Sequence, residues 1–273
     1  MKKTLLALSF AAMALPAFSA EEKTEEKKPE SSVTLSGNFG VFSDYRFRGI
    51  SQTRLAPAAQ GGFDFAHKSG FYLGNWNSSV SSEQYLNGAG LEMDFYGGFK
   101  TDLAGIGLDI GTLYYYYPGA KYNAANDKYN NHEVYLGLSY GPVSFKTSYA
   151  ITDYFGLNTN TLTTGTSTKT GDSKGTVYYD LTLSKEIVDK FTFVAHAGRT
   201  AYKNYTDLSY TDYKIGFAYD VNGWVYGLNF YANQFSDSAI GKEFNTNSGI
   251  TSGDTDTKKL YKSAAVVSLS KTF

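Results

Sequence analysis

The sequence predicts an all-β fold, a transmembrane antiparallel up-and-down β-barrel of about twelve strands, from three observations. The first is a long alternation of apolar and polar residues from Val33 to Arg48. Strands of globular proteins have a mode of about five to six residues, whereas a tilted strand that crosses a bilayer needs about nine to eleven. The second observation is that long and short connections alternate along the chain. The third is an N-terminal export signal.

The export signal occupies residues 1–19. Lys2 and Lys3 precede an apolar run from Leu5 to Leu15, and small residues follow up to Ser19. This is the pattern of a secretory signal peptide, which is too short to span a bilayer as a helix. Residues 20–32 are charged, and we expect a disordered periplasmic tail there. The predicted barrel covers residues 33–273.

The composition of the chain agrees with a barrel and excludes several other classes. Aromatic residues reach 16%, yet the mean hydropathy is only -0.33. The chain has no run of about 18 apolar residues, so it is not a helical membrane protein, while a barrel hides its lipid-facing half in such an average. A net charge of -1 gives no footprint for nucleic acid. With no cysteine in the chain, thiolate chemistry is excluded, and we expect no cofactor and no metal.

The predicted strands follow one another at regular spacing. They include residues 33–48, 57–67, 71–80, 91–100, 106–116, 134–140, 143–151, 177–183, 191–193, 213–219, 224–230 and 265–273. Asn222-Gly223 is the strongest hairpin signal. Connections after the odd-numbered strands are mostly long and the others are tight, as expected for extracellular loops opposite periplasmic turns. A soluble β-sandwich would not explain strand length, loop asymmetry and export signal together.

The last strand ends on an aromatic residue. Its alternate residues Ala265, Val267 and Leu269 form an apolar face that finishes at Phe273. This resembles the C-terminal signature by which the barrel assembly machinery recognises outer-membrane proteins, so we expect that machinery to be a partner.

The segment SDYRFRGISQT, residues 43–53, is the most distinctive stretch of the chain. It occurs together with Pro57, Gln60, Gly61, Phe63-Asp64 and Gly70-Phe71-Tyr72. On these residues the chain resembles the TorF-like family of proteobacterial porins, first catalogued as conserved proteins of unknown function. The resemblance implies a barrel in the outer membrane of a Gram-negative bacterium and a channel role. It implies no particular substrate and no catalytic residue.

Charged residues are expected to line the lumen and to form its constriction. By strand parity these are Asp44, Arg46, Arg48, Glu92, Asp94, Asp180, Asp212 and Lys262. We expect Arg46 and Arg48 to face Glu92 and Asp94 across the narrowest part, where opposite charges tune ion selectivity. The alternative is that these charges pair with one another and plug the lumen.

Aromatic residues are expected in girdles at the two membrane interfaces, where amphipathic rings prefer to lie. The candidates are Trp76, Tyr114, Tyr116, Tyr149 and Trp224, with Tyr115 and Tyr117 in the same tyrosine run. A track of inward tyrosines that stacks on sugars is the alternative.

The function that follows is an outer-membrane channel for passive diffusion of small hydrophilic solutes or ions, and not an enzyme. Expected partners are outer-membrane lipid, lipopolysaccharide and the solutes themselves. A closed barrel with an adhesive or structural role is the first alternative. In the long loops, Gly253-Asp254-Thr255-Asp256 could bind calcium through its carboxylates, but a flexible surface loop is the better explanation.

A barrel lipid hydrolase is the enzymatic alternative, and it needs a His–Ser pair on the lipid face near the extracellular rim. We place His67 at a periplasmic turn and His196 inside the barrel. His132 faces outward near the rim, but no serine is expected beside it. The sequence therefore argues against hydrolysis.

Overall fold

The computed structural model describes residues 31–122, 126–162, 167, 169–234 and 260–273. The predicted signal peptide, residues 20–30 of the predicted tail and the proposed calcium loop at residues 253–256 lie outside these ranges.

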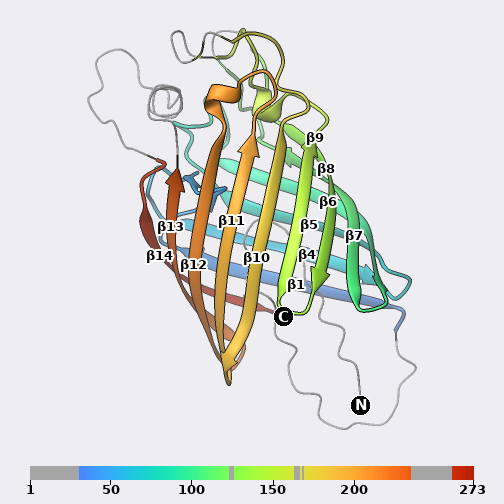
Figure 1. Cartoon of the computed structure of the whole chain (residues 1–273). Coiled ribbons are helices and arrows are strands. Elements are labelled where there is room, and N and C mark those ends of the chain that lie inside the picture. Colours follow the sequence, from blue (N-terminus) through green and yellow to red (C-terminus); the bar gives the residue numbers. More distant parts are fainter. Residues whose placement is uncertain (1–30, 123–125, 163–166, 168, 235–259) are drawn as a thin grey trace.

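Within the described residues, twelve antiparallel strands close into a barrel (Figure 1). They are β1 (Val33–Phe42), β4 (Ala58–His67), β5 (Phe71–Ser79), β6 (Leu91–Leu103), β7 (Ile106–Tyr116), β8 (Asn131–Tyr140), β9 (Val143–Ala150), β10 (Val177–Val188), β11 (Phe191–Ala201), β12 (Tyr210–Val221), β13 (Trp224–Gln234) and β14 (Ala264–Thr272). Each strand pairs with its sequence neighbours, and β14 pairs with β1 from Asn38↔Thr272 to Phe42↔Ser268. The predicted fold class is confirmed.

The two ends of the barrel differ in their connections. Short turns join strands at one end, here the turn end, and the strongest hairpin signal forms one of them with positive φ at Asn222 (54°) and Gly223 (79°). Long connections gather at the other end, the loop end, and are drawn at the top of Figure 1. They contain β2 (Arg46–Phe47), β3 (Ile50–Ser51) and the 3₁₀ turns η1 (Tyr154–Gly156) and η2 (Thr206–Leu208). Among the described residues, no helix is long and apolar enough to cross a bilayer.

The outer face of the barrel is apolar because side chains alternate along each strand. On β8, Leu136 and Leu138 are 41% and 42% exposed, while the intervening positions point inward and Glu133 and Tyr135 are buried. Large apolar side chains repeat this around the barrel: Leu35, Phe39, Phe63, Phe65, Leu73, Phe95, Ile110, Phe145, Leu181, Ile215, Leu228, Phe230 and Val267 are all exposed. So extended an apolar surface is unsuited to water.

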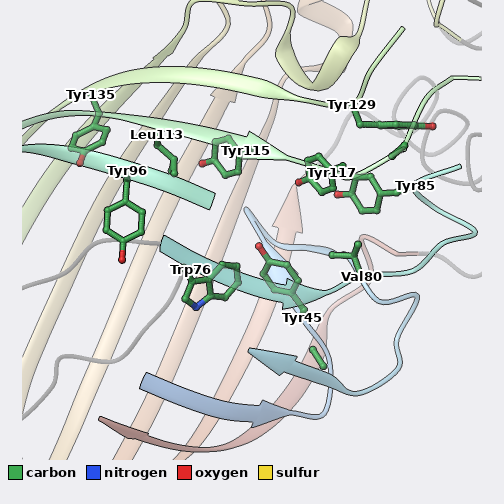
Figure 2. Close-up of a cluster of buried hydrophobic side chains, with 12 residues drawn as sticks. Tyr45, Trp76, Val80, Tyr85, Tyr96, Leu113, Tyr115, Tyr117, Tyr129 and Tyr135 are labelled. Atoms are coloured by element: carbon green, nitrogen blue, oxygen red, sulfur yellow. The ribbon is translucent and has the colours of Figure 1, made fainter. Parts of the chain in front are cut away.

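Strand β5 does not place Trp76 on the outer face, where a girdle residue would lie. Phe71 and Leu73 are 63% and 64% exposed, whereas Trp76 is only 4% exposed and lies inside the barrel beside Tyr45 (Figure 2). The outward Asn75 donates a hydrogen bond to the Asp94 carbonyl of the next strand. An asparagine satisfied along the wall can face outward, so the predicted girdle position of Trp76 is wrong.

Tyrosine rings fill one side of the interior by lying over glycines. A Cβ atom at Gly74 would fall 2.2 Å from the Tyr96 ring, and one at Gly111 would fall 2.4 Å from the Tyr135 hydroxyl. A Cβ at Gly98 would lie 2.6 Å from the Tyr72 hydroxyl. Glycine on the inner wall therefore makes room for these rings, and we call the region over β4–β8 the filled side.

Candidate functional site

The stretch after β1 folds across the loop end instead of continuing the strand. Residues 43–56, called the plug, contain the two-strand hairpin β2–β3, in which Phe47 pairs with Ile50. Its tip has positive φ at Arg48 (46°) and Gly49 (78°), the pattern of a two-residue type I′ turn. The prediction that the first strand extends to Arg48 is wrong. A hairpin alternates apolar and polar residues as a strand does, so the pattern does not distinguish them.

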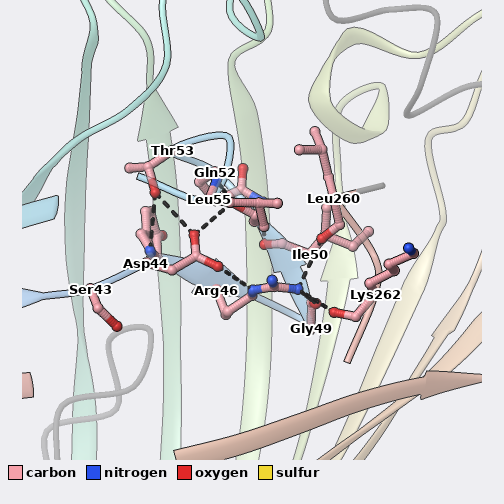
Figure 3. A network of polar contacts seen from close by, with 12 residues as sticks. Ser43, Asp44, Arg46, Gly49, Ile50, Gln52, Thr53, Leu55, Leu260 and Lys262 are labelled. Atoms are coloured by element: carbon pink, nitrogen blue, oxygen red, sulfur yellow. Dashed lines mark hydrogen bonds and ion pairs between the residues drawn. The ribbon is translucent and has the colours of Figure 1, made fainter. Parts of the chain in front are cut away.

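The base of the plug is held by one buried ion pair (Figure 3). Arg46 Nε lies 2.5 Å from Asp44 Oδ2, and both side chains are at most 8% exposed. The Asp44 carboxylate also accepts a hydrogen bond from the Ser51 hydroxyl at 2.6 Å. Arg46 Nη1 donates to the carbonyls of Leu260 and Lys262, each at 2.9 Å, which ties the plug to the chain before β14.

An aromatic cluster seals the plug against β5–β7 (Figure 2). The Tyr45 hydroxyl donates to Glu92 Oε1 at 2.7 Å, and the Tyr117 hydroxyl donates to Glu92 Oε2 at the same distance. Tyr45 also meets the edge of Trp76 at a centroid distance of 5.5 Å. Burial, with the nearby carboxylates of Glu92 and Asp94, raises the pKa of Tyr45 well above its ordinary value, so its hydroxyl keeps the proton it donates.

The tip of the plug inserts Arg48 into a pocket of the barrel wall, here the Arg48 pocket. Its two terminal nitrogens lie 3.0 and 2.8 Å from the two Glu133 oxygens, a bidentate pair. Arg48 Nη1 also donates to the Tyr154 hydroxyl at 2.6 Å. The guanidinium carbon lies 4.1 Å from the ring centroid of Tyr178 and 5.5 Å from that of Tyr154. Burial raises the pKa of Tyr154 to about 12, so that hydroxyl is neutral.

Gly49 lets the tip approach the opposite wall. A Cβ at this position would lie 2.0 Å from Asn233 Oδ1 and 2.9 Å from Asp212 Cβ. The Asn233 side chain donates to the Gly49 carbonyl at 2.9 Å. The plug therefore touches β6, β8 and β13, and it bridges the mouth of the barrel.

Below the plug lies a cavity of about 280 Å³ that reaches the turn end at Gly141 and Pro142. Most of its lining comes from β1 and β9–β14, which we call the open side. The polar residues there include Asn38, Ser144, Lys146, Ser148, Asp180, Thr182, Ser184, His196, Lys214, Asn229, Ser268, Ser270, Lys271 and Thr272. His196 lies between two carboxylates, with Nδ1 3.2 Å from Asp180 and Nε2 3.0 Å from Asp212.

The charges predicted to line the lumen do point inward on the strands, but they pair differently. Arg46 contacts Asp44 and Arg48 contacts Glu133, so the expected meeting with Glu92 and Asp94 is absent from the described residues. Glu92 accepts from tyrosines, and neither Asp94 oxygen has a hydrogen-bond partner within the described residues although both are buried. At the loop end, the alternative in which the lumenal charges pair and plug the barrel describes the structure better.

The other predicted site residues lie partly where they were expected and partly elsewhere. Asp180 lines the cavity, and Asp212 is buried behind it. Lys262 precedes β14 and its side chain is exposed, so only its carbonyl reaches the plug. Tyr114, Tyr116, Tyr149 and Trp224 are exposed on the outer face as expected for girdles, whereas Tyr115 and Tyr117 are buried inside.

Glu133 is the functional residue that sequence reasoning missed. The signal was present, because alternation along β8 places the apolar Leu136 and Leu138 on one face and therefore Glu133 on the other. No local pattern indicates the partner, since Arg48 and Glu133 are 85 residues apart.

Among the described residues, no His–Ser pair lies on the outer face near the loop end. His67 Nδ1 does lie 2.7 Å from the Ser69 hydroxyl, but this contact is at the short turn between β4 and β5. His132 Nε2 lies 2.7 Å from the Thr112 hydroxyl, and its ring meets the edge of Tyr114. Within the described ranges no serine contacts the His132 ring, and no group of three or more His, Cys, Asp or Glu residues could hold a metal ion.

A family model described as a bacterial protein of unknown function, Gcw_chp, matches residues 26–273. No curated protein matches the sequence. The chain is similar to a solved KdgM porin in complex with disordered oligogalacturonate, at 8% identity and a TM-score of 0.49, covering 87% of this chain and 99% of that one. It is also similar to the NanC porin, at 10% identity and a TM-score of 0.48, covering 88% and 99%. For OccAB3 of Acinetobacter baumannii the values are 10% identity, a TM-score of 0.40, and 90% and 65% coverage. Likeness of this degree says nothing about what passes through the barrel.

Proposed function

We propose that this protein is an outer-membrane channel for small hydrophilic solutes. The chain belongs to the Gcw_chp family of bacterial proteins of unknown function. In the conformation described here the plug closes its extracellular mouth. The resemblance of residues 43–53 to the TorF-like porins agrees with this proposal.

The observation that carries the proposal is a polar cavity inside a closed barrel whose outside is apolar. Closed barrels satisfy every backbone group of their strands, which is why they can span lipid. The exposed leucines and phenylalanines suit acyl chains, and the outward Tyr114, Tyr116, Tyr149 and Trp224 suit the interfaces. We assign the loop end to the outside of the cell, because long loops of such barrels are extracellular.

Phe273 extends the pairing of β14 with β1 and adds an aromatic ring to the outer face. The backbone of Phe273 exchanges two hydrogen bonds with Gly37, at 2.8 and 2.9 Å. Its ring covers Gly37 and remains 71% exposed on the outer face. The exposed Phe273 ring and the apolar face around it suit contact with lipid and lipopolysaccharide, the partners that this proposal implies.

The route through the channel follows the open side. Solute entering at the turn end meets hydroxyl groups of Ser144, Thr182 and Ser184 and the ammonium groups of Lys146 and Lys214 before it reaches the plug. Because the filled side is occupied by tyrosine rings, passage needs the plug to move and leaves the β4–β8 wall unchanged.

Conductance in planar bilayers tests the proposal. The variant Tyr45→Phe/Arg48→Ala removes the hydroxyl bond to Glu92 and the ion pair to Glu133, so we expect it to be open for at least several-fold more of the time than the wild type. Arg199→Ala, an exposed arginine on β11, is the matched control and should behave as wild type.

If folded wild type and the double variant both stay silent, the channel is refuted and the closed structural or adhesive barrel takes its place. Folding is verified independently by the heat-dependent shift in electrophoretic mobility. The hydrogen-bonded plug is the observation that favours that second function.

A further inference from the structure

We infer that the Arg48 pocket is a binding site for a solute that carries a guanidinium or primary ammonium group, and that Arg48 is its resident occupant in the closed barrel. The role in solute passage rests on the proposed channel, whereas binding itself does not.

The walls of the pocket belong to the barrel and not to the plug. Glu133 comes from β8, Tyr178 from β10, and Tyr154 from η1 after β9. The Glu133 carboxylate is positioned by the Asn131 side-chain amide at 3.2 Å and by the Tyr115 hydroxyl at 3.4 Å. These groups stay in place when the hairpin leaves, because each is anchored outside residues 43–56.

The chemistry of the walls is that of a cation receptor. A carboxylate with two parallel acceptor oxygens matches the fork of a guanidinium. Aromatic faces attract a cation within about 6 Å of the ring centroid, and Tyr178 and Tyr154 lie inside that range of the Arg48 guanidinium. A free guanidinium can therefore make every contact that Arg48 makes with the barrel wall.

The charge of the mouth favours a cation over an anion. Glu92, Asp94 and Glu133 are each at most 1% exposed, and all three point into the barrel from β6 and β8. Arg48 supplies a positive charge to this region, and Asp94 has no hydrogen-bond donor within the described residues. Once Arg48 withdraws, the buried Glu133 carboxylate loses its bidentate partner, and a buried charge without a counter-charge favours binding of a cation at that position.

Arg48 is held at a position from which a free cation could replace it. Arg48 stands at the tip of a two-residue turn in the left-handed region, a conformation that favours glycine or asparagine over arginine. In the wild type the Arg48 side chain already occupies the pocket, so a free solute binds there only by displacing it. Removing the Arg48 side chain should therefore make binding of free cations visible.

The test of binding is chemical rescue in detergent micelles. Methylguanidinium is added to Arg48→Ala, and the thermal unfolding midpoint is followed by tryptophan fluorescence. We expect low-millimolar methylguanidinium to raise the midpoint of Arg48→Ala by several degrees, because a ligand that binds only the folded state stabilises it. Wild type and Arg199→Ala should show no rise, and the uncharged isostere N-methylurea should have no effect on any variant.

The double variant Arg48→Ala/Glu133→Gln identifies the site. Its rescue should be lost, or should require at least a tenfold higher concentration of methylguanidinium. Rescue that is equal in the single and double variants, or equal in Arg48→Ala and Arg199→Ala, overturns the inference. If Arg48→Ala does not fold, Arg48→Met keeps the apolar stem and replaces it in the same comparison.

Uptake into proteoliposomes links the pocket to passage. Arginine should enter faster than its uncharged isostere citrulline through Tyr45→Phe/Arg48→Ala, and adding Glu133→Gln should remove the difference. Equal uptake of the two solutes before that change overturns selection by the pocket. No uptake of either solute, together with positive rescue, contradicts the proposed channel and supports the binding site.

Discussion

The two sides of the barrel interior have the same strand geometry but differ in the size of their inward side chains. On the filled side, Tyr72, Tyr96 and Tyr135 lie over inner-wall glycines, and hydroxyl groups meet carboxylates, as between Tyr96 and Asp64 at 2.5 Å. On the open side, small hydroxyl residues and three lysines line a cavity of about 280 Å³. Strand number therefore does not decide whether such a barrel is open. The size of the inward side chains decides it.

The largest expected effect is loss of a buried ion-pair partner next to the filled side. Glu133→Ala leaves the Arg48 guanidinium buried without its carboxylate, and breaking a buried pair in this way costs about 3–5 kcal/mol. Asp180→Ala on the open side should lose less, because its side chain is 23% exposed and water replaces the lost contact. Urea unfolding in lipid vesicles measures both. Equal losses would show that the two sides are equally dry.

A charge placed on the outside should destabilise the barrel more than one placed in the cavity. Leu136→Arg puts a guanidinium at mid-strand on the apolar face, where the cost is about 2–4 kcal/mol. Ser139 lines the cavity, so Ser139→Arg keeps its charge hydrated and should be nearly neutral. The difference between their unfolding free energies is the observable, and a difference near zero would contradict the face assignment of β8.

Replacing an inner-wall glycine with alanine should destabilise the barrel where a tyrosine ring covers the glycine, and should be tolerated where no ring does. Gly74→Ala forces the Tyr96 ring to move, and overpacking of this kind costs about 1–3 kcal/mol. At Gly137 the nearest atom to an added Cβ is Asp109 Cβ at 3.4 Å, an ordinary contact, so Gly137→Ala should be tolerated. The same unfolding experiment compares them, and Gly74→Ala with wild-type stability would mean that the tyrosine is not held against the wall.

Local patterns were sufficient for much of the barrel. The predicted strand number is confirmed, as is the alternation of long and short connections. The outward faces of β8 and β12 follow directly from alternation, with Leu136 and Ile215 exposed. These features depend on neighbours two residues apart and on turn residues, so a single sequence carries them.

Local patterns failed where a side chain suits two environments. Trp76 was assigned to an interface because tryptophan is amphipathic, but the same property lets it pack against Tyr45 inside the barrel. Arg46 and Arg48 were assigned to a strand because a hairpin has the same period of two. In both cases the residue type was informative and the direction of the side chain was not.

The sequence by itself determined the barrel, because backbone pairing between consecutive strands needs only period and turns. The tertiary structure alone decided that residues 43–56 cross the mouth, that Arg48 meets Glu133, and that tyrosine rings fill one side of the lumen. Those outcomes depend on groups brought together by closure of the sheet, such as Glu133 with Tyr154 and Tyr178 around one guanidinium. Their energy comes from burial and charge pairing between distant segments, and no short stretch of sequence records it.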